Sequence, residues 1–220
     1  MGLFWQQEKF AYTIKVWKIE EQALFFEQAL DLDREAVLKL KQRFKHTENR
    51  LQWLASRFLL KSLIGEAYRN IQLSAKGKWH LPAGQFLFSL SHSGVYVAAI
   101  KSIFAVGIDI QIRTAKLSRI ATKYIPAHQL AKLRNSRCRE DLYHVHWGIK
   151  EALFKAYGEG GLDYKKHLIV PVDSLPNERN VSTEAFLEKS EQKIVYQAKV
   201  KIWPALFLAW VRKGQKTTID

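Results

Sequence analysis

The chain has 220 residues, 47% of them hydrophobic and 25% charged, so it can bury a substantial core in one large domain or two closely packed smaller ones. No apolar run approaches the ~20 residues that a membrane helix needs, and the N-terminus lacks a signal-peptide pattern. The single cysteine, Cys138, excludes an internal disulfide and a cysteine-based zinc site. We therefore expect a cytoplasmic protein with no membrane partner.

The net charge of +14 implies attraction to an anionic partner, which could be nucleic acid, a membrane surface, a polyphosphate ligand or an acidic protein. The charge is concentrated between residues 113 and 139, which we call the basic segment. This segment contains no Asp or Glu and eight basic residues: Arg113, Lys116, Arg119, Lys123, Lys132, Arg134, Arg137 and Arg139. It predicts a docking surface for an acidic partner, with a solvated helical face as the alternative.

The first part of the chain predicts a strand followed by helices. Alternating apolar residues favour a strand over 10–19, and helical spacing favours helices over 24–44 and 48–64, the second ending at Gly65. Two glycines and a proline predict a loop over 73–84, which carries Lys76 and Lys78.

Residues 85–100 read as two strands around a turn at Ser93 and Gly94, which places His92 at the rim of a sheet. Residues 105–112 alternate cleanly, so Asp109 projects from a strand that looks buried. A buried carboxylate destabilises the fold unless it is paired or meets a metal, which favours a functional role for Asp109.

A helix beginning at Trp147 and stopped by the glycines at 158–161 places Trp147, Glu151 and Lys155 on one face. Taken alone, Glu151 and Lys155 form an ordinary surface pair that contributes roughly 0.2 to 0.5 kcal/mol. Further strands are predicted at 167–172, 193–202 and 205–211.

A short internal repeat is visible, because Trp53 precedes Lys61 by eight residues and Trp147 precedes Lys155 by the same distance. We therefore predict an α+β fold of two similar α/β halves related by a pseudo-twofold axis. The halves are residues 1–104 and 105–220, with the active cleft between them.

Three motifs stand in order along the chain: SLSHSG with His92, GIDIQ with Asp109, and WGIKEALFKAYG with Glu151 and Lys155. With these spacings the sequence resembles the 4′-phosphopantetheinyl transferases of the surfactin-synthetase-activating (Sfp) type. The family's Gly-Lys loop corresponds to Gly77 and Lys78, and its Ser-His-Ser strand end corresponds to residues 91–93. Its Gly-x-Asp strand corresponds to Gly107 and Asp109. Its Trp-x-x-Lys-Glu-Ala-x-x-Lys helix corresponds to Trp147, Lys150, Glu151, Ala152 and Lys155.

The resemblance implies transfer of 4′-phosphopantetheine from coenzyme A to a serine of an apo acyl or peptidyl carrier protein, with release of adenosine 3′,5′-bisphosphate. It implies Mg²⁺ held by Asp109 and Glu151, with Glu151 as the base and Lys155 stabilising the departing bisphosphate. The residues implied to bind coenzyme A are Lys78, Ser91, His92, Lys150 and Lys155, with Arg50 or Arg57 adding a further phosphate contact.

The sequence departs from the family pattern at Gln111, where many relatives carry an acid. A neutral amide offers the ion an oxygen but no charge, so Gln111 is a third and weaker candidate ligand.

The same resemblance implies a monomer whose partner is an acidic carrier protein of fatty-acid, polyketide or peptide synthesis, docked on the basic segment. A nucleic-acid-binding module is the alternative from another class, and it rests on charge alone. A homologue that binds carriers without catalysis is a third possibility, made conceivable by Gln111.

Overall fold

The computed structural model describes residues 2–82, 84, 86–175 and 180–214. Gln85, the first residue of the predicted hairpin, lies outside the described residues. The helices and strands are, in chain order, β1 (Leu3–Lys9), β2 (Tyr12–Lys18), α1 (Ala23–Ala29), α2 (Arg34–Arg43), α3 (Thr47–Ile64), η1 (Gly65–Asn70), β3 (Gln72–Leu73), β4 (Trp79–His80), β5 (Leu87–Ser93), β6 (Tyr96–Ser102), β7 (Val106–Ile112), α4 (Lys116–Arg119), η2 (Ala121–Lys123), α5 (Ala127–Arg134), α6 (Arg139–Tyr157), β8 (Leu168–Ile169), β9 (Asn180–Lys189), β10 (Gln192–Ile202) and β11 (Leu206–Lys213). The predicted α+β class is confirmed.

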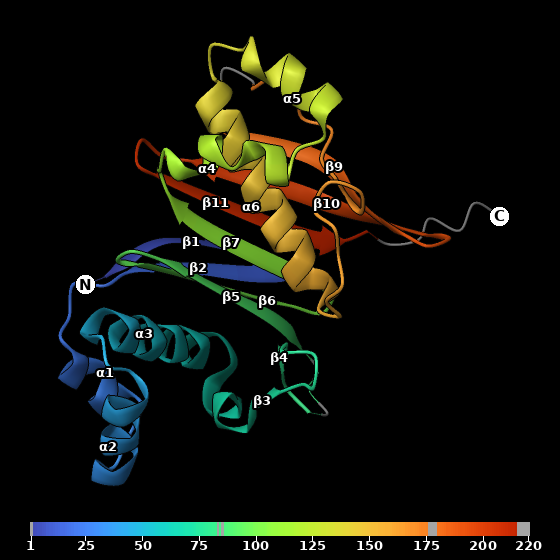
Figure 1. Ribbon diagram of the computed structural model, residues 1–220. Helices are drawn as coiled ribbons and strands as arrows, with labels where there is room; N and C mark the ends of the chain where they lie inside the picture. The colour runs from blue at the N-terminus through green and yellow to red at the C-terminus, as the bar shows by residue number, and fades with distance from the viewer. Residues whose placement is uncertain (1, 83, 85, 176–179, 215–220) are drawn as a thin grey trace.

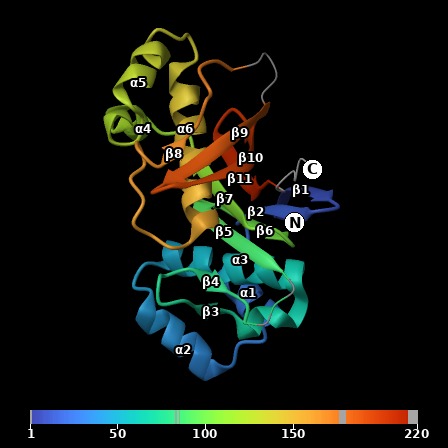
Figure 2. The same cartoon turned by 90° about the vertical axis from the view of Figure 1, so that its right-hand side faces the viewer.

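Two antiparallel sheets form the centre of the molecule (Figure 1). The first has the strand order β1-β2-β6-β5, and the second has the order β7-β11-β10-β9-β8. Apolar residues from β2, β6, β7 and β11 form a single buried cluster between the sheets. Helices α1 and α3 pack on the other face of the first sheet, and α5 and α6 on the other face of the second (Figure 2).

The N-terminal region contains one strand that the sequence pattern missed. Strand β1 pairs with β2 to form a hairpin. The strand predicted over 10–19 is β2, which begins two residues later than predicted because Phe10 and Ala11 form the turn of the hairpin. Phe10 is fully exposed at this turn, so its apolar character misled the prediction.

The predicted helix over 24–44 is divided into α1 and α2. The break is at Asp31, whose φ of 54° is incompatible with a continuing right-handed helix. Helix α2 then starts anew with the Asp33 carboxylate accepting a hydrogen bond from the backbone N–H of Ala36 at 2.7 Å.

Both long helices end at the predicted glycines. Helix α3 ends at Gly65, and α6 ends at Gly158, whose φ of 71° is left-handed. Helix α6 begins at Arg139, eight residues before the predicted start at Trp147. Strand β9 escaped prediction because its alternation is broken: Thr183 and the small Ala185 occupy inward positions, and the apolar Phe186 occupies an outward one.

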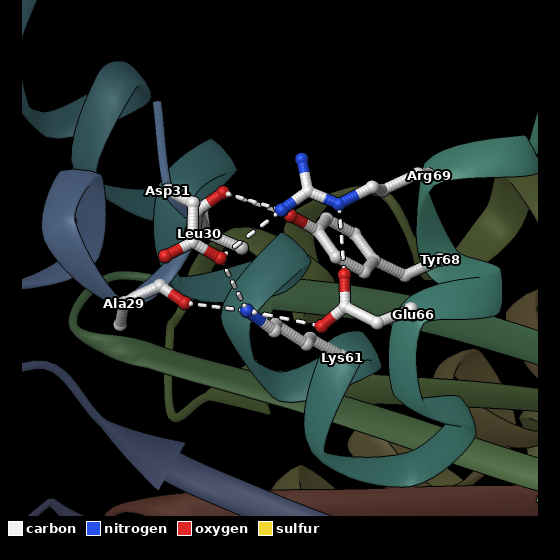
Figure 3. A network of polar contacts seen from close by, with 7 residues as sticks. All are labelled: Ala29, Leu30, Asp31, Lys61, Glu66, Tyr68 and Arg69. Carbon is white, nitrogen blue, oxygen red and sulfur yellow. Dashed lines mark hydrogen bonds and ion pairs between the residues drawn. The ribbon is translucent and has the colours of Figure 1, made fainter. Parts of the chain in front are cut away.

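A network of ion pairs joins α1, α3 and η1 on the surface of the first half (Figure 3). Lys61 lies 2.9 Å from Asp31 and 3.2 Å from Glu66, while Arg69 lies 3.1 Å and 2.8 Å from the same two carboxylates. The network holds the end of α1 against the end of α3.

The predicted pseudo-twofold symmetry is not confirmed, because the first sheet has four strands and the second has five in a different order. All strands of the first sheet precede residue 104, and all strands of the second follow it. The division into domains 1–104 and 105–220 stays a prediction, since the sheets share a buried cluster. Among the described residues no helix combines the length and apolar character that a bilayer crossing requires.

Candidate active site

Three serines on β5 connect the first sheet to β7, which runs beside it (Figure 1). Ser89, Ser91 and Ser93 alternate along the strand, so their hydroxyls reach the same side. The Ser89 hydroxyl accepts a hydrogen bond from the backbone N–H of Ile108 at 3.2 Å, and that of Ser93 accepts one from Ile112 at 3.1 Å. The middle serine, Ser91, is thereby placed next to the acid of β7.

Helix α6 approaches the second sheet closely because glycines lie at the contacts. A Cβ at Gly107 of β7 would lie 1.8 Å from the carbonyl oxygen of Ala152, so no larger residue fits there. A Cβ at Gly148 would lie 2.9 Å from the Cβ of Ala209 on β11. These two contacts bring α6 close to β7 and β11, so that Lys155 of the helix reaches Asp109 of β7.

The centre of the site is Asp109, which is 6% exposed. Its Oδ1 accepts hydrogen bonds from Lys155 Nζ at 2.7 Å and from the Ser91 hydroxyl at 2.9 Å. Lys155 also donates to the Ser91 hydroxyl oxygen at 2.9 Å and to the carbonyl of Ile108 at 3.0 Å. The second oxygen of Asp109, Oδ2, is buried with no hydrogen-bond partner among the described residues. One oxygen of the Asp109 carboxylate is therefore paired, and the other has no partner among the described residues.

Glu151 lies near this cluster, but it does not form the surface pair with Lys155 that the spacing suggested. Lys155 binds Asp109, whereas Glu151 Oε1 accepts a hydrogen bond from the Tyr164 hydroxyl at 2.9 Å. Burial raises the pKa of Glu151, the negative charge of Asp109 raises it further, and Lys155 and the Tyr164 hydroxyl oppose the shift. A carboxyl with a raised pKa is better suited to accept a proton.

The donor set suits a Mg²⁺ ion. Two carboxylates, one of them with an unpaired buried oxygen, are what a hard cation that keeps several waters requires. No group of three or more His, Cys, Asp or Glu that could hold a metal occurs in the part of the chain that the structure describes. Gln111 stands two residues beyond Asp109, and its amide nitrogen donates to the carbonyl of Ile112 at 3.3 Å.

Two adjoining pockets lead to this cluster, and they share Trp79 and Leu90 as a common wall. The first lies between the turn joining β3 to β4, strand β5 and the end of α6, and its lining includes Lys76, Lys78, Phe88, Phe154, Lys155 and Gly160. The second is lined by residues of α3 and its surroundings, among them Arg43, Asn49, Trp53, Arg57 and His92. Together the pockets provide a groove lined with basic side chains.

Lys78 lies where the first pocket meets the end of α6. Its Nζ donates to the carbonyl of Ala156 at 2.9 Å, and burial lowers its pKa. Gly158 makes room for it, because a Cβ there would lie 2.1 Å from Lys78 Cδ. The predicted Gly-Lys loop and the glycine stop of α6 are therefore in direct contact.

Arg57 is the buried cation of the second pocket. It is 7% exposed, and its guanidinium carbon lies 5.1 Å from the ring centre of Trp53 and 4.4 Å from that of Trp79. Burial lowers its pKa to about 10, with Arg43 adding to the shift. Arg57 has no ion pair with a carboxylate within the described residues. An anionic ligand would meet this unbalanced charge.

His92 lines the same pocket. Part of its ring stays exposed, but the surrounding protein lowers its pKa, and the charge of Lys155 lowers it further. Arg50 is not among the residues that line either pocket, and its buried Nε has no partner among the described residues. Of the two alternatives for a phosphate contact, the structure therefore brings Arg57 to the groove.

Lys150 is not where the sequence interpretation placed it. It is fully buried, lines neither pocket, and donates to the carbonyl of Tyr164 at 2.6 Å and to that of Leu168. Burial lowers its pKa to about 7. A side chain directed into the C-terminal core has no access to coenzyme A, which corrects the expectation drawn from the motif.

The basic segment is partly neutralised. Arg113 forms an ion pair with Asp141, and Lys132 lies 3.4 Å from Asp173. Arg139 lies 3.7 Å from Glu140. The other five cations have no ion pair to any described residue: Lys116, Arg119, Lys123, Arg134 and Arg137.

Comparison with known proteins agrees with this geometry. Residues 105–202 match the model of the 4′-phosphopantetheinyl transferase superfamily. The resemblance to the 4′-phosphopantetheinyl transferases is confirmed. Two curated relatives from Bacillus subtilis are similar to the chain: "4′-phosphopantetheinyl transferase ffp", 28% identical over 142 residues, and "4′-phosphopantetheinyl transferase", 25% identical over 156 residues. The matches cover 60% and 65% of this chain, and 60% and 66% of the relatives, so the chain spans less than two thirds of either.

The superfamily match includes Asp109, Glu151 and Lys155 but begins after the β5 serines. The placement of Ser91, and of the pocket residues that precede residue 105, therefore comes from this structure. Sequence reasoning missed Tyr164, which lies in a loop without any periodic pattern. It also overlooked that Ser89, Ser91 and Ser93 alternate, a signal in plain view beside His92.

Proposed function

We propose that the protein transfers the 4′-phosphopantetheine group of coenzyme A to a serine hydroxyl of an apo carrier protein. One observation carries the proposal: Asp109, Glu151 and Lys155, which lie inside the region matched by the transferase superfamily, gather with Ser91 of β5 beside a groove rich in cations. Pyrophosphate chemistry needs such an arrangement of carboxylates and a lysine.

In the proposed reaction the serine oxygen forms a bond to the pantetheine-side phosphorus, and the bond from that phosphorus to the bridging oxygen breaks. The electron pair leaves with adenosine 3′,5′-bisphosphate. Glu151 accepts the serine proton, directly or through a water, for a gain of about 10² to 10⁴ in rate. The raised pKa of Glu151 supports this role.

Asp109 and Glu151 would hold a Mg²⁺ ion, with Gln111 as a neutral third candidate. When bound, the ion supplies positive charge that neutralises the pyrophosphate oxygens. Lys155, now fixed by Asp109 and Ser91, adds a second positive charge at the same place and stabilises the departing bisphosphate. Asp109 thus acts mainly by holding cations.

The coenzyme would lie along the groove formed by the two pockets. Lys78, Lys155 and the β5 strand face one end, and Arg57 with His92 faces the other. Buried Arg57, which has no carboxylate partner in the described chain, suits a phosphate group, and Trp79 offers an aromatic wall between the two ends.

The acceptor would be an acidic carrier protein that docks on the basic segment, where five cations are free of ion pairs to described residues. We propose that the protein acts as a monomer in the cytoplasm. The matches to the two relatives cover only part of each chain, so the carrier protein and coenzyme A are proposed as partners.

The direct test is incubation with several apo carrier proteins, coenzyme A and Mg²⁺, followed by mass spectrometry of the carriers. The proposal predicts a mass gain of one phosphopantetheine group on a serine. Carrier binding without any mass gain would indicate the non-catalytic homologue. A salt-sensitive gel shift with DNA or RNA, with no effect of coenzyme A on the melting temperature, would favour a nucleic-acid-binding module.

A further inference from the structure

The loop that follows α6 folds back over the helix and covers its Glu151 face. The ring of Tyr164 stacks on Trp147 with centroids 5.9 Å apart and packs against Phe154 with centroids 5.8 Å apart. Trp147, Glu151 and Phe154 are four and three residues apart, so Glu151 lies between the two rings on the same side of the helix. The Tyr164 ring therefore spans the position from which Glu151 projects.

The Tyr164 hydroxyl reaches the carboxylate directly. It donates a hydrogen bond of 2.9 Å to Glu151 Oε1. One hydrogen bond to one oxygen restrains rotation of the carboxylate and leaves the other oxygen for a second interaction. Because Asp109 repels Glu151, an unrestrained Glu151 would rotate away from it.

Lys150 fixes the backbone of the same loop. It directly precedes Glu151 on α6 but lies in the core, where its Nζ donates to the carbonyls of Tyr164 and Leu168. A buried ammonium that donates to one carbonyl of the loop and to one at the start of β8 ties both ends of this connection to the helix. The same tyrosine is thus held by its backbone, by its ring and by its hydroxyl.

We propose that Tyr164 is a positioning residue that orients the Glu151 carboxylate toward Asp109, and that Lys150 anchors Tyr164 for this purpose. The inference rests on the proposed function, since it assigns Tyr164 a part in shaping the same metal and base site. It also gives the motif lysine Lys150 a role other than coenzyme binding.

The test compares Tyr164→Phe, which keeps the ring and removes only the hydroxyl, with Tyr157→Phe. Tyr157 is a matched control because it is the last residue of α6, just before the loop that carries Tyr164, and its ring faces Lys189 instead of Glu151. Mn²⁺ serves as the probe, with its affinity measured by titration calorimetry in the presence and absence of coenzyme A. For Tyr164→Phe we expect Mn²⁺ affinity and kcat to fall about 10- to 100-fold, the range for residues that orient metal ligands. We expect the Kd for coenzyme A to be unchanged.

Lys150→Met should reproduce the loss of Mn²⁺ affinity if the variant folds, and Tyr164→Phe decides the matter if it does not. Equal Mn²⁺ affinity and kcat in Tyr164→Phe and Tyr157→Phe would overturn the inference, as would a wild-type protein that binds no Mn²⁺. Failure of the proposed function would look different: no carrier would gain mass, while the two variants would still differ in Mn²⁺ affinity.

Discussion

Helices α3 and α6 each carry a lysine eight residues after a tryptophan, yet the two lysines have opposite surroundings. Lys61 on α3 pairs with Asp31 and Glu66, whose side chains are 65% and 64% exposed. Lys155 on α6 pairs with Asp109, whose side chain is 8% exposed. Similar sequence spacing therefore produced a surface network in one half and a buried cluster in the other.

The difference lies in what the rest of the chain brings to each lysine. Around Lys61, two cations face two carboxylates in water, so the charges balance and are screened (Figure 3). Around Lys155, one cation faces two carboxylates, one of which has an unpaired buried oxygen. A buried imbalance of this kind is unfavourable for folding and suited to binding another cation.

The largest expected effect comes from the acid of the buried cluster. Glu151→Gln keeps the size of the side chain and a hydrogen-bond acceptor for Tyr164 but cannot take the serine proton. We expect kcat for holo-carrier formation to fall by about 10² or more. Mass spectrometry of the carrier over time measures the rate, and circular dichroism checks that the fold is intact.

The matched control is Glu66→Gln in the surface network, for which we expect wild-type kcat. If both substitutions left kcat unchanged, the distinction between the two clusters would be lost. If both abolished it, the network around Lys61 would have a part in catalysis that its exposure does not suggest.

A smaller effect is expected from the basic segment. Replacing Arg134, Arg137 and Arg139 by Glu should raise the KM for an acidic carrier about tenfold, equivalent to about 1.4 kcal/mol, because attraction becomes repulsion. The Kd for coenzyme A should stay the same, since none of these arginines lines either pocket. Added salt should reduce the difference between the KM values of the variant and the wild type for the carrier.

A control with the same change in net charge replaces three exposed lysines elsewhere by Glu: Lys9, Lys39 and Lys199. It should leave the KM for the carrier close to the wild-type value at moderate salt. An equal rise in KM in both triple variants would show that net charge, and not this surface, attracts the carrier.

The smallest effect belongs to Lys61→Met, which should lower the melting temperature slightly and leave kcat unchanged. The hydrogen bond from Lys61 lowers the pKa of Asp31. The pKa of Glu66 is lowered mainly by its hydrogen bond with Arg69 and further by that with Lys61. Carboxyls with lowered folded-state pKa values stabilise the fold above their unfolded values of 3.8 and 4.5 and lose this contribution as the pH falls through the folded-state values.

The melting temperatures of wild type and Lys61→Met should therefore differ at neutral pH and low salt, and converge on acidification or at high salt. Thermal unfolding followed by circular dichroism across pH measures this. A difference that persists when Asp31 and Glu66 are protonated would mean that Lys61 acts through packing or through its hydrogen bond to the carbonyl of Ala29 at 3.0 Å.

Periodicity was enough to predict the parts of the fold that depend on local patterns. Strand β7 with Asp109, helix α3 and the glycine ends of both long helices follow from alternation, helical spacing and the left-handed conformation that glycine allows. Strand β9 and the break at Asp31 did not. The alternation in β9 is interrupted by an inward Thr183 and an outward Phe186, and a single unusual backbone angle at Asp31 leaves no periodic signal.

The sequence predicted which residues of the site are chemically reactive, but not which residues surround them. Asp109 and Glu151 stood out as acids with partners to be found, but the partners come from distant segments: Ser91 from β5 and Tyr164 from a loop. The motif singled out Lys150 but could not show where its side chain lies. A position on a helix did not reveal that the ammonium group is directed into the core.

We propose that the Lys155 cluster performs chemistry and that the Lys61 network does not. The most direct test compares the rate at which wild type, Lys61→Met and Lys155→Met add one phosphopantetheine mass to a carrier that wild type modifies. We predict equal rates for wild type and Lys61→Met, and a rate lower by about 10² or more for Lys155→Met. Equal rates for the two lysine variants would show that Lys155 has no larger part in the reaction than Lys61.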